Sequence, residues 1–163
     1  MNALVLYESR FGNTERVAEA IALALQECVS TRLASVEETH DCVEALHGID
    51  LLVVGGPTHS HGISAELRQA VECLGSHALD HVRVAAFDTR VPGPRVVTGS
   101  AAVRLGRLLR RRGAWLVVPP ASFIVSGREG PLEQGELDHA RTWAHEVLHA
   151  VGVRVHDQVQ APA

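Results

Sequence analysis

Ala3-Leu-Val-Leu-Tyr-Glu-Ser-Arg-Phe-Gly-Asn-Thr14 is the stretch that decides the fold of this 163-residue chain. The apolar run from Ala3 to Tyr7 predicts a strand buried on both faces, as in a parallel sheet. A polar turn containing Gly12 follows it. The turn leads into a helical pattern whose apolar residues share one side: Val17, Ile21, Ala24, Leu25 and Cys28. This order of strand, turn and helix predicts an α/β fold.

The turn from Ser9 to Thr14 has the features of a phosphate-binding loop. Backbone N–H groups at the start of a helix have no partner within the helix, and that end of the helix carries roughly half a positive charge. Ser9, Asn13 and Thr14 add side-chain donors, and Gly12 lets the backbone approach a ligand closely. The alternative is an ordinary strand–turn–helix connection that binds nothing.

The same turn resembles the phosphate loop of the flavodoxins, [ST]-x-[ST]-G-x-T, which holds the monophosphate of FMN. Ser9, Gly12, Asn13 and Thr14 match this pattern. Phe11 replaces a hydroxyl residue, and an aromatic at this position is similar to the flavodoxin domains of flavodiiron proteins and to flavodoxin-like quinone reductases. The resemblance, which spans roughly residues 3–151, implies non-covalent FMN binding through the turn, including Arg10.

The rest of the chain alternates strands and helices. Strands are expected at residues 31–35, 51–55, 82–87 and 115–118, with helices at 64–75, 100–112 and 132–150 and a helical tendency over 36–48. Residues 123–125 are a candidate extension of the sheet. We therefore predict a three-layer, doubly wound, five-stranded parallel sheet in the flavodoxin-like order 2-1-3-4-5, with ligands at its switch point. Residues 1–152 would form this domain and residues 153–163 a loose tail.

Two further loops are expected beside the phosphate turn. The first, Gly55-Gly56-Pro57-Thr58-His59-Ser60-His61-Gly62, resembles the flavin-contacting loop of flavodoxin-like proteins. It contains no Trp, so His59 or His61 offers its only ring. The resemblance implies that the members of this loop that bind the cofactor are Pro57, Thr58, His59, Ser60 and Gly62. The alternatives are a solvated turn and, for the two histidines, metal ligation.

The second loop, residues 88–99, begins Asp88-Thr89-Arg90 where flavodoxins carry a stacking Tyr. The resemblance implies that Asp88 and Thr89 form hydrogen bonds to the pyrimidine edge of FMN, with Arg90 near the flavin. A guanidinium there would favour the anionic reduced flavin, because an opposite charge stabilises the ionised form. This predicts a higher-potential flavin with a face open to a planar acceptor such as a quinone. The alternative for Arg90 is pairing with a surface carboxylate.

Composition excludes several functions. All 15 basic residues are arginine, so neither a side-chain Schiff base nor the P-loop lysine of nucleotide triphosphatases is possible. The net charge of −4 makes nucleic acid an unexpected partner. The three cysteines form no C-x-x-C pair, which disfavours a disulfide framework or a zinc knuckle. No apolar run reaches membrane-spanning length and no signal-peptide pattern opens the sequence, so we expect a cytoplasmic protein without membrane insertion.

A competing motif lies in the last predicted helix. His145-Glu146-Val147-Leu148-His149 fits H-E-x-x-H, in which two histidines on one helix face bind zinc and the glutamate is a general base. No third histidine follows at the spacing of the longer zinc-protease pattern, because that position is Val155. A zinc hydrolase through His145, Glu146 and His149 is therefore a remote alternative, and we expect no metal.

The function favoured by the resemblance is an FMN-binding redox protein, either an electron carrier or a small flavin-dependent reductase with a quinone-type acceptor. Its electrons would come from a redox partner protein or a nicotinamide donor. The alternatives are a protoporphyrinogen-oxidase-like flavodoxin enzyme and a flavodoxin-fold regulatory or binding module that no longer holds flavin. The sequence leaves the oligomeric state open.

Overall fold

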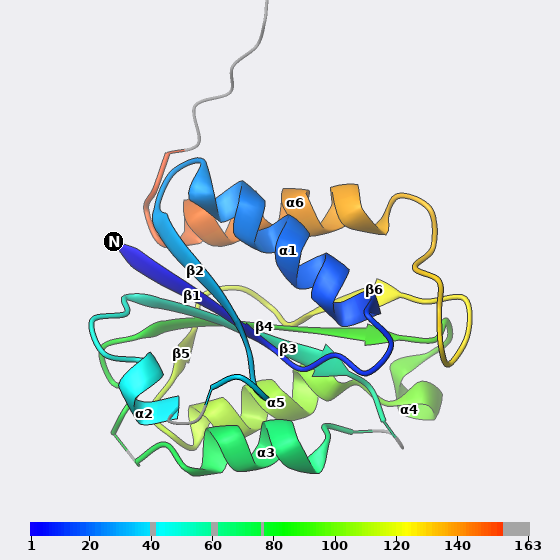
Figure 1. Ribbon diagram of the computed structural model, residues 1–163, viewed down its shortest axis with the longest axis horizontal. Coiled ribbons are helices and arrows are strands. Elements are labelled where there is room, and N and C mark those ends of the chain that lie inside the picture. The colour runs from blue at the N-terminus through cyan, green and yellow to red at the C-terminus, as the bar shows by residue number, and fades with distance from the viewer. Residues whose placement is uncertain (40–41, 60–61, 76, 155–163) are drawn as a thin grey trace, which may run out of the picture.

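A parallel β-sheet lies between two layers of helices (Figure 1). The computed structural model describes residues 1–39, 42–59, 62–75 and 77–154. The sheet has the order β2-β1-β3-β4-β5, with β6 also paired to β4, and every pairing is parallel. The predicted order is therefore confirmed. The strands are β1 (Asn2–Tyr7), β2 (Ser30–Ser35), β3 (Leu51–Pro57), β4 (Arg83–Arg90), β5 (Trp115–Leu116) and β6 (Ala121–Ile124).

Helices cover both faces of the sheet (Figure 1). One face carries α1 (Asn13–Gln26) and α6 (Glu136–Ala150). The other carries α2 (Cys42–Ala45), α3 (Ala65–Glu72) and α5 (Ala101–Arg110). A short helix, α4 (Arg95–Thr98), lies near the carboxyl end of β4.

β1 is buried on both faces because each face meets a separate apolar core. Ala3, Val5 and Tyr7 belong to the core beneath α1 and α6. Leu4 and Leu6 belong to the core beneath α3 and α5. The continuous apolar run at the start of the chain is what a strand between two cores requires.

The helix starts on the second face are capped as the sequence suggests. The hydroxyl oxygen of Ser64 accepts a hydrogen bond from the backbone N–H of Leu67 at 3.0 Å, at the start of α3. The hydroxyl oxygen of Ser100 accepts one from Val103 at 3.3 Å, at the start of α5. Such caps satisfy backbone donors that have no partner within the helix.

The fifth strand position differs from expectation, because two short strands share it. β5 pairs with the start of β4, and β6 pairs with Phe87–Arg90 at its end. The candidate extension at residues 123–125 is thus realised in part by β6. β4 continues to Arg90 rather than ending at Phe87, because β3 pairs with it as far as Thr89 and β6 pairs with it as far as Arg90.

Two other expectations change. The tendency over residues 36–48 yields only the four-residue α2. α6 begins at Glu136 rather than Leu132, because Leu132 forms an antiparallel bridge with Val125. Of the two tryptophans, Trp143 packs in the core, whereas Trp115 is 77% exposed on β5. Most of the predicted tail lies outside the described residues. Within those residues, no helix is long and apolar enough to span a bilayer.

Candidate functional site

A pocket lies at the carboxyl ends of β1, β3 and β4, where the predicted switch point falls. It encloses about 620 Å³ of empty space, including its open mouth. Three predicted loops and one further segment meet there. The lining residues are Ser9, Arg10, Phe11, Asn13, Thr14, Pro57, Thr58, His59, Thr89, Arg90, Val91, Thr98, Val125 and Arg128.

The turn after β1 offers a series of unused backbone donors. Gly12 precedes α1 with a φ of 79°, a left-handed conformation that favours glycine. Among the described residues, no acceptor faces the backbone N–H groups of residues 11–14. These donors point from the start of a 14-residue helix, where the helix dipole also favours an anion.

Hydroxyl groups adjoin these donors. The Oγ of Ser9 accepts a hydrogen bond from the backbone N–H of Glu15 at 3.2 Å, which leaves its own hydrogen available. The hydroxyl oxygens of Thr14 and Thr89 lie 2.8 Å apart and both residues are buried. Since one of them donates to the other, the pair retains one hydrogen for a ligand.

The loop after β3 brings a histidine into the pocket. His59 and Gly62 exchange two backbone hydrogen bonds of 2.9 and 2.7 Å, which fold the loop back on itself. The Nε2 atom of His59 is buried and has no hydrogen-bond partner. Ser60, a predicted site residue, and His61, the other candidate ring, lie outside the described residues, and Gly62 is not a lining residue.

Asp88 is placed differently from its predicted role at the flavin edge. Its side chain is fully buried and turned toward the start of α5. There its Oδ2 accepts hydrogen bonds from the hydroxyl of Ser100 at 2.6 Å, the backbone N–H of Ala102 at 2.9 Å and the hydroxyl of Thr58 at 3.1 Å. The Thr58 hydroxyl in turn accepts from the backbone N–H of Ala101 at 2.9 Å. The Asp88 carboxylate and the Thr58 hydroxyl therefore both stabilise the start of α5; Thr58 also lines the pocket, whereas Asp88 does not.

Arg90 organises the segment after β4. Its Nη1 donates to the hydroxyl of Thr98 and to the carbonyl of Gly93, each at 2.8 Å, and to the carbonyl of Val91 at 3.3 Å. The expected alternative, pairing with a surface carboxylate, is therefore wrong. The Nε of Arg90 is buried without a partner, as is the Nε2 of His59. Two unsatisfied donor or acceptor atoms in one pocket suit a polar ligand.

The charges around the pocket are of one sign. Among the described residues, its lining includes Arg10, Arg90 and Arg128 but no Asp or Glu, although the whole chain carries a net charge of −4. An anionic ligand is favoured at such a site.

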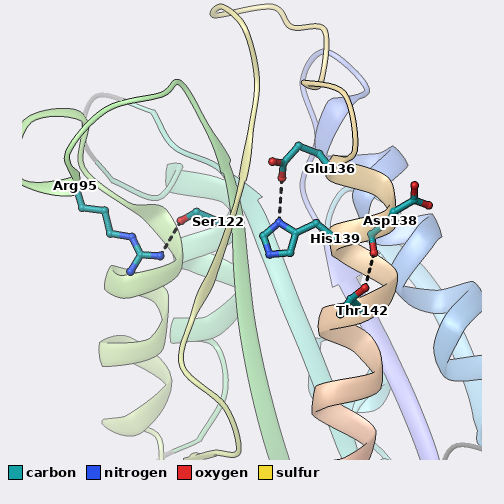
Figure 2. A network of polar contacts seen from close by, with 6 residues as sticks. All are labelled: Arg95, Ser122, Glu136, Asp138, His139 and Thr142. Carbon is teal, nitrogen blue, oxygen red and sulfur yellow. Dashed lines mark hydrogen bonds and ion pairs between the residues drawn. The ribbon is translucent and has the colours of Figure 1, made fainter.

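The segment that sequence reasoning missed joins β6 to α6. Val125 and Arg128 line the pocket from this side, and Val91 and Thr98 join them from the segment after β4. Figure 2 shows β6 passing between α4, whose Arg95 points to Ser122, and α6, where His139 faces Glu136. The Gly127 and Gly130-Pro131 turn signals indicate a tight reversal there, but not which surface it meets.

Phe123 forms part of the wall between this segment and the core. It is fully buried, with its ring centroid 5.0 Å from that of His139 and 6.1 Å from those of Phe87 and Trp143. Phe123 is therefore a core residue.

The zinc motif on α6 finds no support in the described residues. His145 lies 3.5 Å from a carboxylate oxygen of Glu27 on the neighbouring segment. Among residues that the structure describes, no three His, Cys, Asp or Glu side chains gather closely enough to hold a metal ion.

A doubly wound parallel sheet of order 2-1-3-4-5, with unpaired backbone donors of a helix N-terminus at its switch point, is typical of the flavodoxin-like class of α/β proteins. The sequence model of the flavodoxin domain matches residues 4–93, and the chain belongs to this family. It is thus an FMN-binding, flavodoxin-like redox protein. A comparison with curated proteins finds no match.

Solved structures show the same fold. Oxidised flavodoxin 1 from Bacillus cereus is 18% identical, with a TM-score of 0.75 over 91% of this chain and 98% of that one. A flavodoxin, WrbA-like protein from Agrobacterium tumefaciens is 20% identical, with a TM-score of 0.71 over 94% and 99%. The Flv1 flavodiiron core from Synechocystis is 18% identical, with a TM-score of 0.74 over 93% of this chain and 36% of that one.

The residues of the pocket fit FMN. The unused N–H groups of residues 11–14 suit its phosphate, and the unpartnered atoms of His59 and Arg90 suit polar groups of its ring. Within the part of the chain that the structure describes, the aromatic side chains in the lining are Phe11, which is 44% exposed, and His59. No Trp or Tyr is among these described lining residues, in contrast to the usual flavodoxin pattern.

Proposed function

We propose that the pocket binds FMN with its phosphate on residues 9–14 and its ring between the loops after β3 and β4. The unpartnered backbone donors at the start of α1 carry this proposal. Ser9 and the Thr14–Thr89 pair add hydroxyl hydrogens to the phosphate side. Pro57 and His59 would flank the ring on one side, and Arg90 and Val91 on the other.

The bound cofactor supplies reversible uptake and release of electrons. Arg90 would set how readily this occurs, because a guanidinium near the ring stabilises negative charge that accumulates on reduction. Its three hydrogen bonds to residues 91–98 hold the guanidinium in place. The redox potential of the bound flavin would therefore be higher than that of low-potential flavodoxin electron carriers. The electron acceptor would be a planar, quinone-like molecule. The electron donor would be a nicotinamide or a redox protein.

Titration of the apoprotein with FMN tests the binding. Quenching of flavin fluorescence at micromolar concentrations, and a yellow complex that survives gel filtration, are the expected results. Gly12→Asp should abolish them, because it places a side chain at φ 79° and a negative charge at the phosphate.

A redox titration of the complex tests the role of Arg90. Arg90→Gln should lower the potential, by about 60 mV for each tenfold loss of preference for the anionic reduced form in a one-electron step, and Arg90→Lys should recover part of it. A very low second one-electron potential in the unmodified protein would contradict the proposal. Steady NADPH oxidation in the presence of a quinone would distinguish a reductase from a carrier.

A further inference from the structure

The segment between β6 and α6 forms a hairpin over residues 125–132. Val125 and Leu132 form an antiparallel bridge, and the backbone N–H of Ser126 donates to the carbonyl of Pro131 at 2.9 Å. The N–H of Gly130 donates to the carbonyl of Gly127 at 3.1 Å and closes the tip. The hairpin is anchored to the sheet, because the N–H of Val125 donates to the carbonyl of Arg90 at 3.0 Å. These backbone hydrogen bonds therefore hold the hairpin in a defined position beside the pocket.

Asn13 fastens this hairpin to the turn after β1. Its Nδ2 donates to the carbonyl of Glu129 at 2.9 Å, across 116 positions of sequence. Gly130 makes the contact possible, since a Cβ there would lie 2.4 Å from that same Nδ2. Figure 1 shows the chain between β6 and α6 on the side of the sheet where α1 begins. The side chain of Asn13 is thus committed to holding the hairpin.

The hairpin brings Arg128 into the pocket that the turn lines with Arg10. Both arginines are exposed, and neither forms an ion pair or hydrogen bond with any described residue. Two uncommitted guanidinium groups therefore border the unused N–H groups of residues 11–14. Guanidinium groups bind phosphate oxygens through charge-assisted, often bidentate hydrogen bonds.

We infer that the hairpin is the outer wall of a cationic phosphate subsite, in which Arg128 and Arg10 bind the phosphate dianion of the ligand. This inference rests on the proposed FMN site and deepens it. The N–H groups and the partial charge of the helix start alone would bind phosphate with only a weak dependence on salt. Guanidinium groups add a charge term that salt screens, and that term acts on FMN but not on riboflavin, which lacks the phosphate. The subsite therefore selects the phosphorylated flavin.

The first experiment compares FMN and riboflavin on the apoprotein by fluorescence titration at 20 and 300 mM salt. Arg128→Gln should weaken FMN about tenfold at the lower salt and less at the higher, with riboflavin unchanged. Arg128→Lys should restore part of the loss. Arg110→Gln is the matched control, because it removes the same charge from an exposed residue in the last turn of α5 and should change neither affinity.

The second experiment uses inorganic phosphate alone, so it does not depend on flavin binding. Phosphate should raise the thermal midpoint of the apoprotein, since a ligand that binds the folded state stabilises it, and Arg128→Gln should reduce that rise. Gly130→Ala should reduce it equally by displacing Asn13. Adding Arg128→Gln to Gly130→Ala should then have little further effect.

The outcomes separate this inference from the proposed function. An unchanged ratio of FMN to riboflavin affinity in Arg128→Gln, or equal losses for both flavins, would overturn the cationic subsite while leaving FMN binding intact. A protein that responds to phosphate through Arg128 but binds neither flavin would overturn the FMN proposal and keep the subsite. A phosphate response identical in the unmodified protein and Arg128→Gln would also overturn the inference.

Discussion

Asp88 carries a buried carboxylate whose Oδ2 joins β4 to the start of α5. Three donors converge on that oxygen, from Ser100, Ala102 and Thr58. Asp88→Ala leaves all three without their acceptor, so we expect the free energy of unfolding to fall by about 2–4 kcal/mol. Urea denaturation would measure this, with Asp138→Ala, an exposed carboxylate paired to Arg141, as the control that changes little.

Asp88→Asn tests where that side chain acts. Because the carboxylate faces α5 and does not line the pocket, FMN affinity should stay within about twofold of the unmodified protein. A larger loss, with stability retained, would return Asp88 to the flavin edge that the family resemblance implies.

Tyr7 links β1 to α1 through its hydroxyl, which donates to Oε1 of Glu15 at 3.0 Å. Burial, and then this bond to a carboxylate, raise the pKa of Tyr7 from 10.0 to about 12. The folded state thus keeps a proton that the unfolded state loses, so this contribution to stability is complete below pH 10 and is lost as the pH rises from 10 to 12. Tyr7→Phe should flatten that part of a plot of unfolding free energy against pH. An equally steep fall in the variant would contradict this assignment.

At the scale of elements, the short helix α4 is held from one side by Arg90 and from the other by the contact of its own Arg95 with Ser122. The helix has four residues, with none buried, and Arg90 holds it through Thr98 and the carbonyls of Val91 and Gly93. Arg90→Ala should therefore increase hydrogen exchange at the amides of residues 97–99, while the buried strand β3 stays protected. Arg83→Ala, at the opposite end of β4, is the control. Unchanged exchange at residues 97–99 would show that α4 holds its own conformation.

The elements show which structural information is local. The run Ala3–Tyr7 and the helical pattern after it specify β1 and α1 directly, and the capping of α3 by Ser64 follows from local chemistry. The last residue of β4, Arg90, could not be predicted, because its pairing partner is Ile124 of β6. The same holds for the hairpin, whose contact with Asn13 spans 116 positions. The periodicity of apolar residues in a segment indicates which of its faces is buried, but it does not indicate which distant segment packs against that face.

The same limit applies to the site. The turn Ser9–Thr14 was predictable because a strand, a glycine turn and a helix start carry a phosphate-binding signature in consecutive residues. The side chain of Asp88 was placed wrongly because its partners come from α5 and Thr58. Arg128 was missed because nothing in its local sequence indicates a pocket. The predicted ends of the strands therefore indicate where the pocket lies. They do not distinguish the residues that line the pocket from the residues that support it.

Over the whole molecule, net charge and local charge oppose each other. The chain carries a net charge of −4, whereas the charged residues of the pocket lining are Arg10, Arg90 and Arg128. Net charge alone would repel the FMN dianion, so added salt would speed its association. The local field would attract it, so added salt would slow its association, because nearby charges dominate once the ligand is within a Debye length of about 10 Å.

We expect the local field to determine the rate. Stopped-flow mixing of the apoprotein with FMN should give an association rate constant that falls severalfold between 20 and 300 mM salt, while that of riboflavin barely changes. Arg10→Gln combined with Arg128→Gln should remove most of this salt dependence, and the distant Arg110→Gln should not. A rate constant for FMN that rises with salt would show that the carboxylates of the whole surface govern the approach of the ligand. The arginines of the pocket would then act only after contact, because a field confined to the bound complex changes the dissociation rate but not the encounter.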